Sequence, residues 1–88
     1  MNWLTLGGQG LVAANRIVAV GAIDAAPIRR LLEQIPAGQI IILTGGRRRQ
    51  TALVLDSGHI ILTPWSIRQV ENALARLAAA TDPGAEEI

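Results

Sequence analysis

The chain has 88 residues and a mass of 9.3 kDa, which is enough for one small domain and excludes a multidomain enzyme. It contains no cysteine, so disulfide bonds, a thiolate nucleophile and cysteine-type zinc sites are excluded. Hydrophobic residues make up 50% of the chain and the mean hydropathy is +0.35, which is more apolar surface than one small core can bury. We therefore expect a second protein surface, most simply another copy of the same chain, to cover the excess.

All eight basic residues are arginines, against seven acidic residues. Three of the acids lie in the last eight positions, so residues 1–80 carry an excess of four positive charges. The planar guanidinium group can bind phosphate or carboxylate through two hydrogen bonds at once. A bias toward arginine codons also accounts for the missing lysines, but it does not account for the clustering of the arginines.

The sequence predicts a cytoplasmic protein that does not bind a membrane. A membrane span takes roughly 20 apolar residues. The apolar stretch 11–23 is interrupted by Asn15 and Arg16, and the stretch 40–43 is far too short. The N-terminus also lacks the basic region, apolar run and cleavage site of a signal peptide.

The first quarter of the chain predicts two strands. Residues 2–6 alternate polar and apolar side chains, and residues 16–20 are rich in β-branched residues. The glycine-rich segment 7–10 between them is typical of a turn or a bulge.

Residues 24–36 predict a helix. Asp24 is a favourable N-cap, Pro27 is tolerated in the first turn, and Pro36 followed by Gly38 ends the helix. The apolar residues follow the spacing i, i+3, i+4 and i+7, which places them on one face; they are Ile28, Leu31, Leu32 and Ile35.

Three more strands are predicted at residues 39–43, 51–55 and 59–62. The last two are separated by residues 56–58, a connection of hairpin length with Gly58 available for a positive φ angle. A connection this short favours antiparallel pairing of the two strands.

A second helix follows, starting either at Thr63 with Pro64 in the first turn or at Ser66 with Gln69 in a capping box. Its apolar stripe consists of Ile67, Val70, Leu74 and Leu77. The resulting order β-β-α-β-β-β-α favours an α+β domain with a small antiparallel β-sheet and two helices. We assign residues 1–80 to this single domain and residues 81–88 to a disordered acidic C-terminal tail.

Candidates for catalysis are few. The single histidine, His59, closely follows Asp56 and Ser57, but a catalytic triad is defined by geometry across a fold and not by adjacency in one turn. We interpret Asp56 and Ser57 as caps of turn amides and His59 as the opening of a strand. One histidine, no cysteine and scattered carboxylates do not support a metal site. The sequence therefore predicts no enzyme, no metal and no cofactor.

The strongest local feature is the segment of residues 44–51 between two predicted strands; its residues 44–50 are here called the arginine loop. Two glycines permit a tight turn, and Arg47, Arg48 and Arg49 follow them directly. Three adjacent like charges repel one another unless an anion neutralises them, which favours a polyanion such as nucleic acid. A solvated hairpin tip, a salt-bridge patch between subunits and a site for a small phosphorylated ligand are the alternatives.

Duplex DNA held through its phosphates fits the remaining residues best. The two aromatic residues, Trp3 and Trp65, lie outside the arginine-rich run, which argues against a stacking platform for single strands. Neither predicted helix is basic enough for a recognition helix. Asn15 and Arg16 form a polar pair within an apolar stretch, so Arg16 is expected either to support the arginine loop or to make a subunit contact.

Four segments, in this order and at these distances, resemble the RemA family of extracellular-matrix regulatory proteins; they are residues 12–18, 26–30, 46–48 and 56–62. The resemblance covers about residues 4–75. It implies a bacterial DNA-binding regulator that activates matrix and biofilm genes. It also implies assembly into a ring-shaped homo-octamer around which DNA wraps.

The resemblance also implies site residues. The family's arginine pair corresponds to Arg47 and Arg48, and its Asn-Arg pair corresponds to Asn15 and Arg16 as DNA-contact or assembly positions. Pro27 matches the family's proline at the start of the first helix.

The chain departs from the family pattern after the arginine pair, where Arg49 and Gln50 replace the common Thr and Arg. This replacement shifts the expected third phosphate contact to Arg49. The segment 8–10 and Gly58 differ as well. The predicted partners are double-stranded DNA and further copies of the chain. The alternative is an adaptor oligomer whose arginine loop docks an acidic protein or a phosphorylated small ligand.

Overall fold

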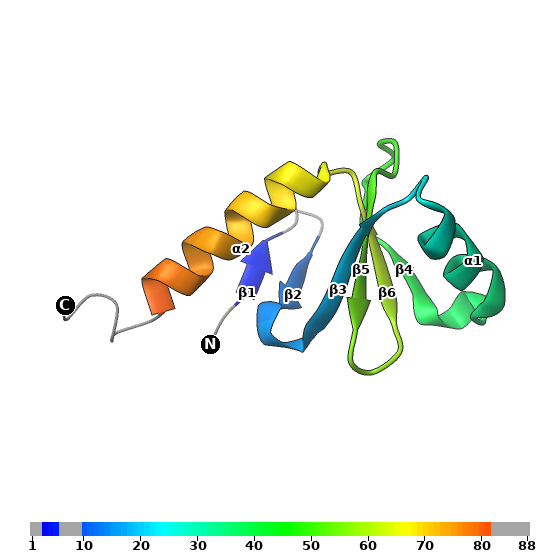
Figure 1. Cartoon of the computed structure of the whole chain (residues 1–88), viewed down its shortest axis with the longest axis horizontal. Helices are drawn as coiled ribbons and strands as arrows, with labels where there is room; N and C mark the ends of the chain where they lie inside the picture. The colour runs from blue at the N-terminus through cyan, green and yellow to red at the C-terminus, as the bar shows by residue number, and fades with distance from the viewer. Residues whose placement is uncertain (1–2, 6–9, 82–88) are drawn as a thin grey trace.

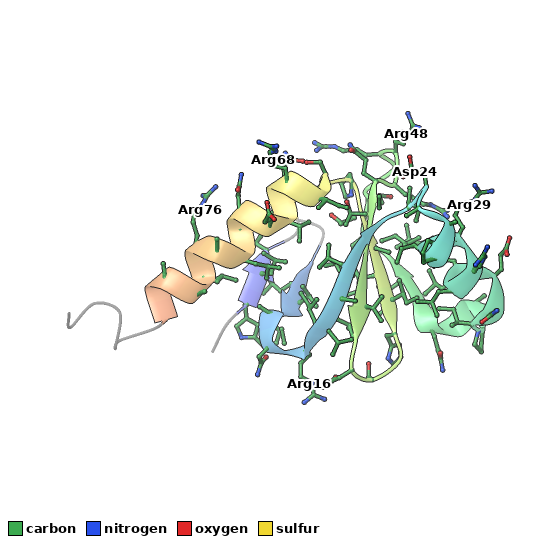
Figure 2. The ribbon with its side chains drawn as sticks, viewed as in Figure 1. Arg16, Asp24, Arg29, Arg48, Arg68 and Arg76 are labelled. Carbon is green, nitrogen blue, oxygen red and sulfur yellow. The ribbon has the colours of Figure 1, made fainter. Side chains whose placement is uncertain are left out.

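The computed structural model describes residues 3–5 and 10–81. Strands β1 (Trp3–Thr5) and β2 (Leu11–Ala13) form a two-stranded antiparallel sheet. A four-stranded sheet has the order β3-β5-β6-β4 and consists of β3 (Ile17–Ala22), β4 (Ile40–Ile42), β5 (Thr51–Leu55) and β6 (Ile60–Thr63). Helices α1 (Ala26–Gln34) and α2 (Ile67–Thr81) lie on opposite sides of this sheet (Figure 1). The arginines labelled in Figure 2 point into solvent.

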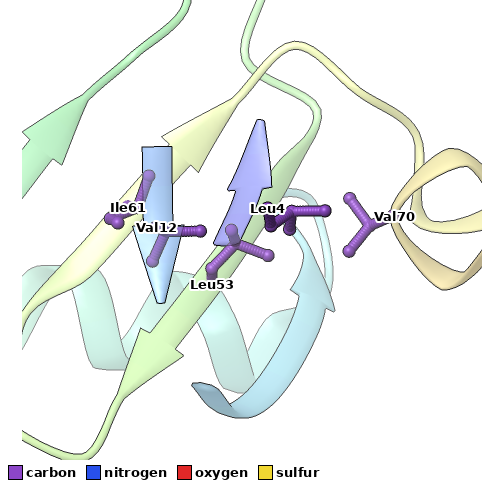
Figure 3. Close-up of a cluster of buried hydrophobic side chains, with 5 residues drawn as sticks. All are labelled: Leu4, Val12, Leu53, Ile61 and Val70. Atoms are coloured by element: carbon purple, nitrogen blue, oxygen red, sulfur yellow. The ribbon is translucent and has the colours of Figure 1, made fainter. Parts of the chain in front are cut away.

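The first face of the central strands is covered by the two-stranded sheet and α2. Leu53 of β5 pairs with Ile61 of β6, and alternation along each strand directs both side chains to the same face. There they pack with Leu4, Val12 and Val70 to form a buried cluster (Figure 3). Three of the four residues of the predicted apolar stripe of the second helix cover this face: Val70 is buried, and Leu74 and Leu77 pack at its margin. The fourth, Ile67, is exposed.

The second face of the same strands is covered by α1. Ala52, Ile60 and Leu62 point to it, and the predicted apolar face of the first helix packs against them through Ile28, Leu31, Leu32 and Ile35. Gly21 of β3 permits this close packing, since a Cβ atom there would lie 2.5 Å from Cγ1 of Ile28. Burial on both faces explains why β5 and β6 are continuous apolar runs without alternation.

The α+β class with two helices is confirmed, but the sheet is mixed and not wholly antiparallel. Strand β4 pairs with β6 in parallel, with Ile40 opposite Ile60 and Ile42 opposite Leu62. The hairpin of β5 and β6 is antiparallel, as predicted. Residues 43–50 carry the chain past the end of β6, so β5 lies on the far side of β6 from β4. That crossing makes β4 and β6 run in the same direction.

The structure also contains one strand that the sequence did not predict. Strand β2 has three residues and lies in an apolar stretch, so it shows no alternation that could indicate a strand. It pairs with β1, and a 3₁₀ turn (Ala14–Arg16) separates it from β3. The observed order is therefore β-β-β-α-β-β-β-α. Segment 6–9, which includes most of the predicted glycine-rich turn, lies outside the described residues.

The two helix starts differ in how well they were predicted. Helix α2 begins after Ser66, whose Oγ accepts a hydrogen bond from the Gln69 amide at 3.2 Å while Gln69 Oε1 accepts one from the Ser66 amide at 2.9 Å. This confirms the capping box. Asp24 as the N-cap of α1 is wrong, because the N-cap is Ala25 and no side chain caps it. The turn that joins Ala25 to Ala22 places Asp24 one residue too early.

The C-terminal end is described as far as Thr81, which belongs to α2 although it was assigned to the tail. The rest of the predicted tail, residues 82–88, lies outside the described residues. Neither helix in the described part of the chain has the length and hydropathy to cross a membrane.

Candidate nucleic-acid interface

The arginine loop connects β4 to β5 and is anchored at both ends to β6. The amide of Leu43, just before the loop, donates to the carbonyl of Leu62 at 3.0 Å, and the amide of Gln50 donates to the carbonyl of Thr63 at 2.9 Å. Gln50 also accepts a hydrogen bond from the Ile23 amide at 3.0 Å. The loop therefore leaves the sheet and returns to it at neighbouring positions of one strand.

The tip of the loop depends on its two glycines. The Arg47 amide donates to the carbonyl of the buried Thr44 at 3.0 Å, which closes a turn with Gly45 and Gly46 at its centre. Their φ angles are +60° and +85°, the left-handed values that a type I′ turn requires at both central positions. The tight turn predicted from the two glycines is therefore confirmed, and the three arginines directly follow it.

The three arginines of the loop are exposed and have no acidic partner among the described residues. The only ion pair in the described part of the chain joins Arg16 to Asp56. No hydrogen bond of the Arg47, Arg48 or Arg49 side chains occurs within that part either. Their guanidinium groups therefore present unneutralised positive charge to an outside partner.

Arg68, which is not among the predicted site residues, adds positive charge to this end of the molecule. It lies in the first turn of α2 and is exposed. Figure 2 shows Arg48 and Arg68 on the same side of the molecule. The arginine loop follows β4 and α2 follows β6, and parallel strands end at the same edge of a sheet. Predicting that parallel pair would have placed Arg68 near the loop.

Arg16 lies at the opposite end of the sheet. Its neighbour Ile17 pairs with Leu55 at one end of β5, whereas Ala22 pairs with Thr51 next to the arginine loop. Figure 2 shows Arg16 and Arg48 on opposite sides of the molecule. The expectation that Arg16 supports the arginine loop is therefore wrong for the loop of its own chain.

Asn15 and Arg16 both occupy the 3₁₀ turn between β2 and β3 and are exposed. The Arg16 Nε atom donates to Oδ1 of Asp56 at 3.1 Å, and the Arg16 carbonyl accepts a hydrogen bond from the Asp56 amide at 2.9 Å. The Arg16 side chain is still 60% exposed, so the ion pair leaves it accessible to a second partner. A subunit contact or a DNA contact at this end stays a prediction.

The hairpin of β5 and β6 holds the residues considered for catalysis. Ser57 Oγ and His59 Nδ1 share a hydrogen bond of 2.8 Å, and Ser57 Oγ accepts a longer one from the His59 amide. Asp56 points to Arg16 instead of the imidazole, so these three side chains do not form a relay. The described residues also hold no cluster of three His, Cys, Asp or Glu side chains that could bind a metal ion.

Residues 3–74 match the model of the RemA-like family, described as extracellular matrix regulatory protein A-like. The chain belongs to this family. The match runs from β1 into α2 and includes both the arginine loop and the 3₁₀ turn with Asn15 and Arg16. The family resemblance seen in the sequence is thereby confirmed.

Three relatives illustrate the similarity of this RemA-like chain to known proteins. It is 43% identical over 61 residues to a protein of Synechococcus elongatus, covering 68% of this chain and 70% of the relative. It is 32% identical over 75 residues to one of Geobacillus kaustophilus (84% and 86%) and 34% identical over 85 residues to one of Clostridium beijerinckii (96% and 91%). All three carry the name "Putative regulatory protein". The names indicate a regulatory protein rather than an enzyme.

Proposed function

We propose that this RemA-like protein is a transcriptional regulator that binds duplex DNA through phosphate contacts of Arg47, Arg48 and Arg49. The observation that carries the proposal is the state of these side chains, which are exposed, have no acidic partner among the described residues, and lie in a loop tied to β6 at both ends. A polyanion relieves the mutual repulsion of such a cluster. The anchored backbone limits the entropy lost when the loop binds.

One copy of the loop is a weak DNA site. Three or four phosphate contacts give a log-log dependence of affinity on salt concentration of about −3 to −4, so binding falls steeply toward physiological salt. Several loops on one assembly make the later contacts intramolecular and raise the avidity by a factor on the order of 10² or more. The proposed function therefore requires an oligomer.

We also propose that the chain assembles head to tail into a closed ring. The outer strands of the sheet are β3 and β4, and both expose apolar side chains, with Val18 65% and Ile42 49% exposed. Two different apolar surfaces on opposite edges favour a heterologous contact, which forms a ring when the rotation between copies closes. The resemblance to the RemA family implies eight copies. Asn15 and Arg16 remain DNA-contact or assembly positions in this proposal.

The regulated genes are proposed from the family alone. The description of the matching family, extracellular matrix regulatory protein A-like, supports genes of the extracellular matrix as the targets. Genes of biofilm formation are added because the resemblance to the RemA family implies them. The phosphate-based mode of binding accounts for affinity and leaves sequence preference to DNA shape and deformability.

The test is the double substitution Arg47→Ala/Arg48→Ala in a gel shift with duplex DNA at low salt. We expect the affinity for DNA to fall at least tenfold, because each lost phosphate contact reduces the number of counterions released on binding. The log-log slope of affinity against salt concentration should become shallower by about two. The matched control is Arg30→Ala/Arg76→Ala, which removes the same charge from exposed positions on α1 and α2. Undiminished binding by the loop variant, or an equal loss in the control, would show that the arginine loop is not the DNA site.

A further inference from the structure

A cleft of about 490 Å³ lies beside the arginine loop, where three segments distant in sequence meet. Its walls come from residues 22–24 at the end of β3, residues 48–50 of the arginine loop, and residues 66–67 at the start of α2. Small-molecule sites in proteins have volumes of about 300–1,000 Å³. The cleft therefore has the size of a site for a small ligand.

The walls of the cleft are held together by hydrogen bonds, so it exists before any ligand binds. The Ile23 amide donates to the Gln50 carbonyl at 3.0 Å, which ties the first wall to the second. The Thr51 hydroxyl donates to the Trp65 carbonyl at 2.6 Å, which ties the second wall to the segment that leads into α2. The capping box at Ser66 then fixes the first turn of the helix. A preorganised site of this kind loses little entropy on binding.

The charges in the cleft indicate a ligand that carries more than phosphate. Arg48 and Arg49 line one wall and Asp24 lines another, and within the described residues Asp24 forms no ion pair with either arginine. Two guanidinium groups suit a phosphate group. A carboxylate so close repels the phosphates of DNA, so it weakens a surface that serves DNA alone. Asp24 instead suits a ligand that also offers a hydroxyl or amino group as hydrogen-bond donor.

The cleft also has an apolar part. Ile23, which directly follows β3, and Ile67 of α2 line it, and Ile67 is exposed although it belongs to the predicted apolar stripe of its helix. An apolar ring seated against these two side chains would remove their surface from water.

We propose that this cleft binds a nucleoside phosphate. Arg48 and Arg49 hold the phosphate, Asp24 accepts a hydrogen bond from a ribose hydroxyl or a base amino group, and the base lies against Ile23 and Ile67. Inorganic phosphate satisfies only the first of these contacts. One consequence rests on the proposed function: a nucleotide in the cleft occupies two of the guanidinium groups that hold DNA, so the nucleotide and DNA exclude each other.

The test is isothermal titration calorimetry of the full chain without DNA, using AMP, GMP, CMP and UMP, with inorganic tripolyphosphate as a probe of charge alone. We expect saturable binding of at least one nucleotide, with one site per chain. Arg49→Ala should weaken nucleotide binding at least tenfold, because the variant loses a charge-assisted hydrogen bond to the phosphate. The control Arg76→Ala removes the same charge from a separate groove beside Trp65 and should change the affinity less than threefold.

Asp24→Ala separates recognition of a nucleotide from attraction by charge. We expect this variant to bind the nucleotide about tenfold more weakly, through the lost hydrogen bond to a charged acceptor, and to bind tripolyphosphate as well as or better than the unchanged chain. If Asp24→Ala strengthened the binding of the nucleotide and of tripolyphosphate alike, the proposal would be overturned, because the cleft would then respond to charge only. Absence of saturable heat with all four nucleotides would overturn it too.

A gel shift with and without the nucleotide distinguishes this proposal from the proposed function. Release of DNA by the nucleotide supports mutual exclusion, and a stable complex of all three components overturns it. Nucleotide binding by a chain that fails to retain DNA contradicts the DNA-binding function and leaves the nucleotide site standing. DNA retention by a chain that binds no nucleotide contradicts the nucleotide site and leaves the DNA-binding function standing.

Discussion

Gly46 shows how a single residue shapes the candidate site. Its φ angle of +85° lies in the left-handed region, which an L side chain adopts only with strain. A Cβ atom at Gly46 would meet no atom within 4 Å, so the requirement for glycine comes from the backbone and not from packing. Gly38, in the 3₁₀ turn Ala37–Gln39, also has open space around it but has no positive φ angle. The two glycines therefore isolate the conformational effect.

We expect Gly46→Ala to lower the free energy of unfolding by about 1–2 kcal/mol, because alanine pays the strain of a positive φ angle. Gly38→Ala should leave it unchanged or raise it by about 0.5 kcal/mol, since alanine restricts the unfolded chain. Urea denaturation at one fixed protein concentration measures both values. Equal effects of the two substitutions would contradict the role assigned to the loop conformation.

At the scale of the elements, the start of α2 is the best-defined boundary in the chain. The reciprocal hydrogen bonds of Ser66 and Gln69 satisfy two amides that a helix start leaves without partners. The same turn brings Arg68 to the end of the sheet that carries the arginine loop. Capping thus connects the local stability of the helix to the geometry of the candidate site.

Ser66→Ala should lower the free energy of unfolding by about 1 kcal/mol, because it removes the hydroxyl that accepts from the Gln69 amide. Asn72→Ala, in an exposed position of the same helix, should change it by no more than about 0.5 kcal/mol. Chemical denaturation followed by circular dichroism measures both. A loss in the Asn72 variant as large as that in the Ser66 variant would argue against a stabilising cap.

At the scale of the whole molecule, the excess of apolar residues expected from the composition is seen as hydrophobic side chains exposed on the surface. Six large hydrophobic residues are exposed within the described part of the chain; they are Trp3, Leu11, Val18, Ile41, Ile42 and Ile67. The excess of apolar surface expected from composition thus lies on both outer strands of the four-stranded sheet, on the two-stranded sheet and at the start of α2. Its location on opposite edges is what favours the proposed ring.

We expect light scattering to give a mass several times the 9.3 kDa of one chain. Ile42→Asp should shift the protein toward the monomer without unfolding it, because it places a charge on a half-exposed edge residue. The control Gln34→Glu, at an exposed position of α1, should keep the assembly. A protein that stays monomeric at all concentrations would remove the ring and the argument from avidity.

The sequence alone determined the features that depend on neighbours within a few residues. The apolar faces of both helices, the hairpin at residues 56–59, the capping box at Ser66 and the glycine turn before Arg47 follow from side-chain periodicity and turn chemistry. The arginine cluster is local in the same sense, because its three charges are adjacent in the chain and indicate a candidate site without any knowledge of the strand pairing.

Only the tertiary structure decided which of these features lie together. The parallel pairing of β4 with β6 depends on contacts between strands far apart in the chain, and no local pattern encodes such pairing. That pairing places Arg68 at the end of the sheet with the arginine loop, and the register of β3 places Arg16 at the other end. The cleft beside Asp24 arises in the same way, because its walls come from three segments that meet only when the sheet is assembled.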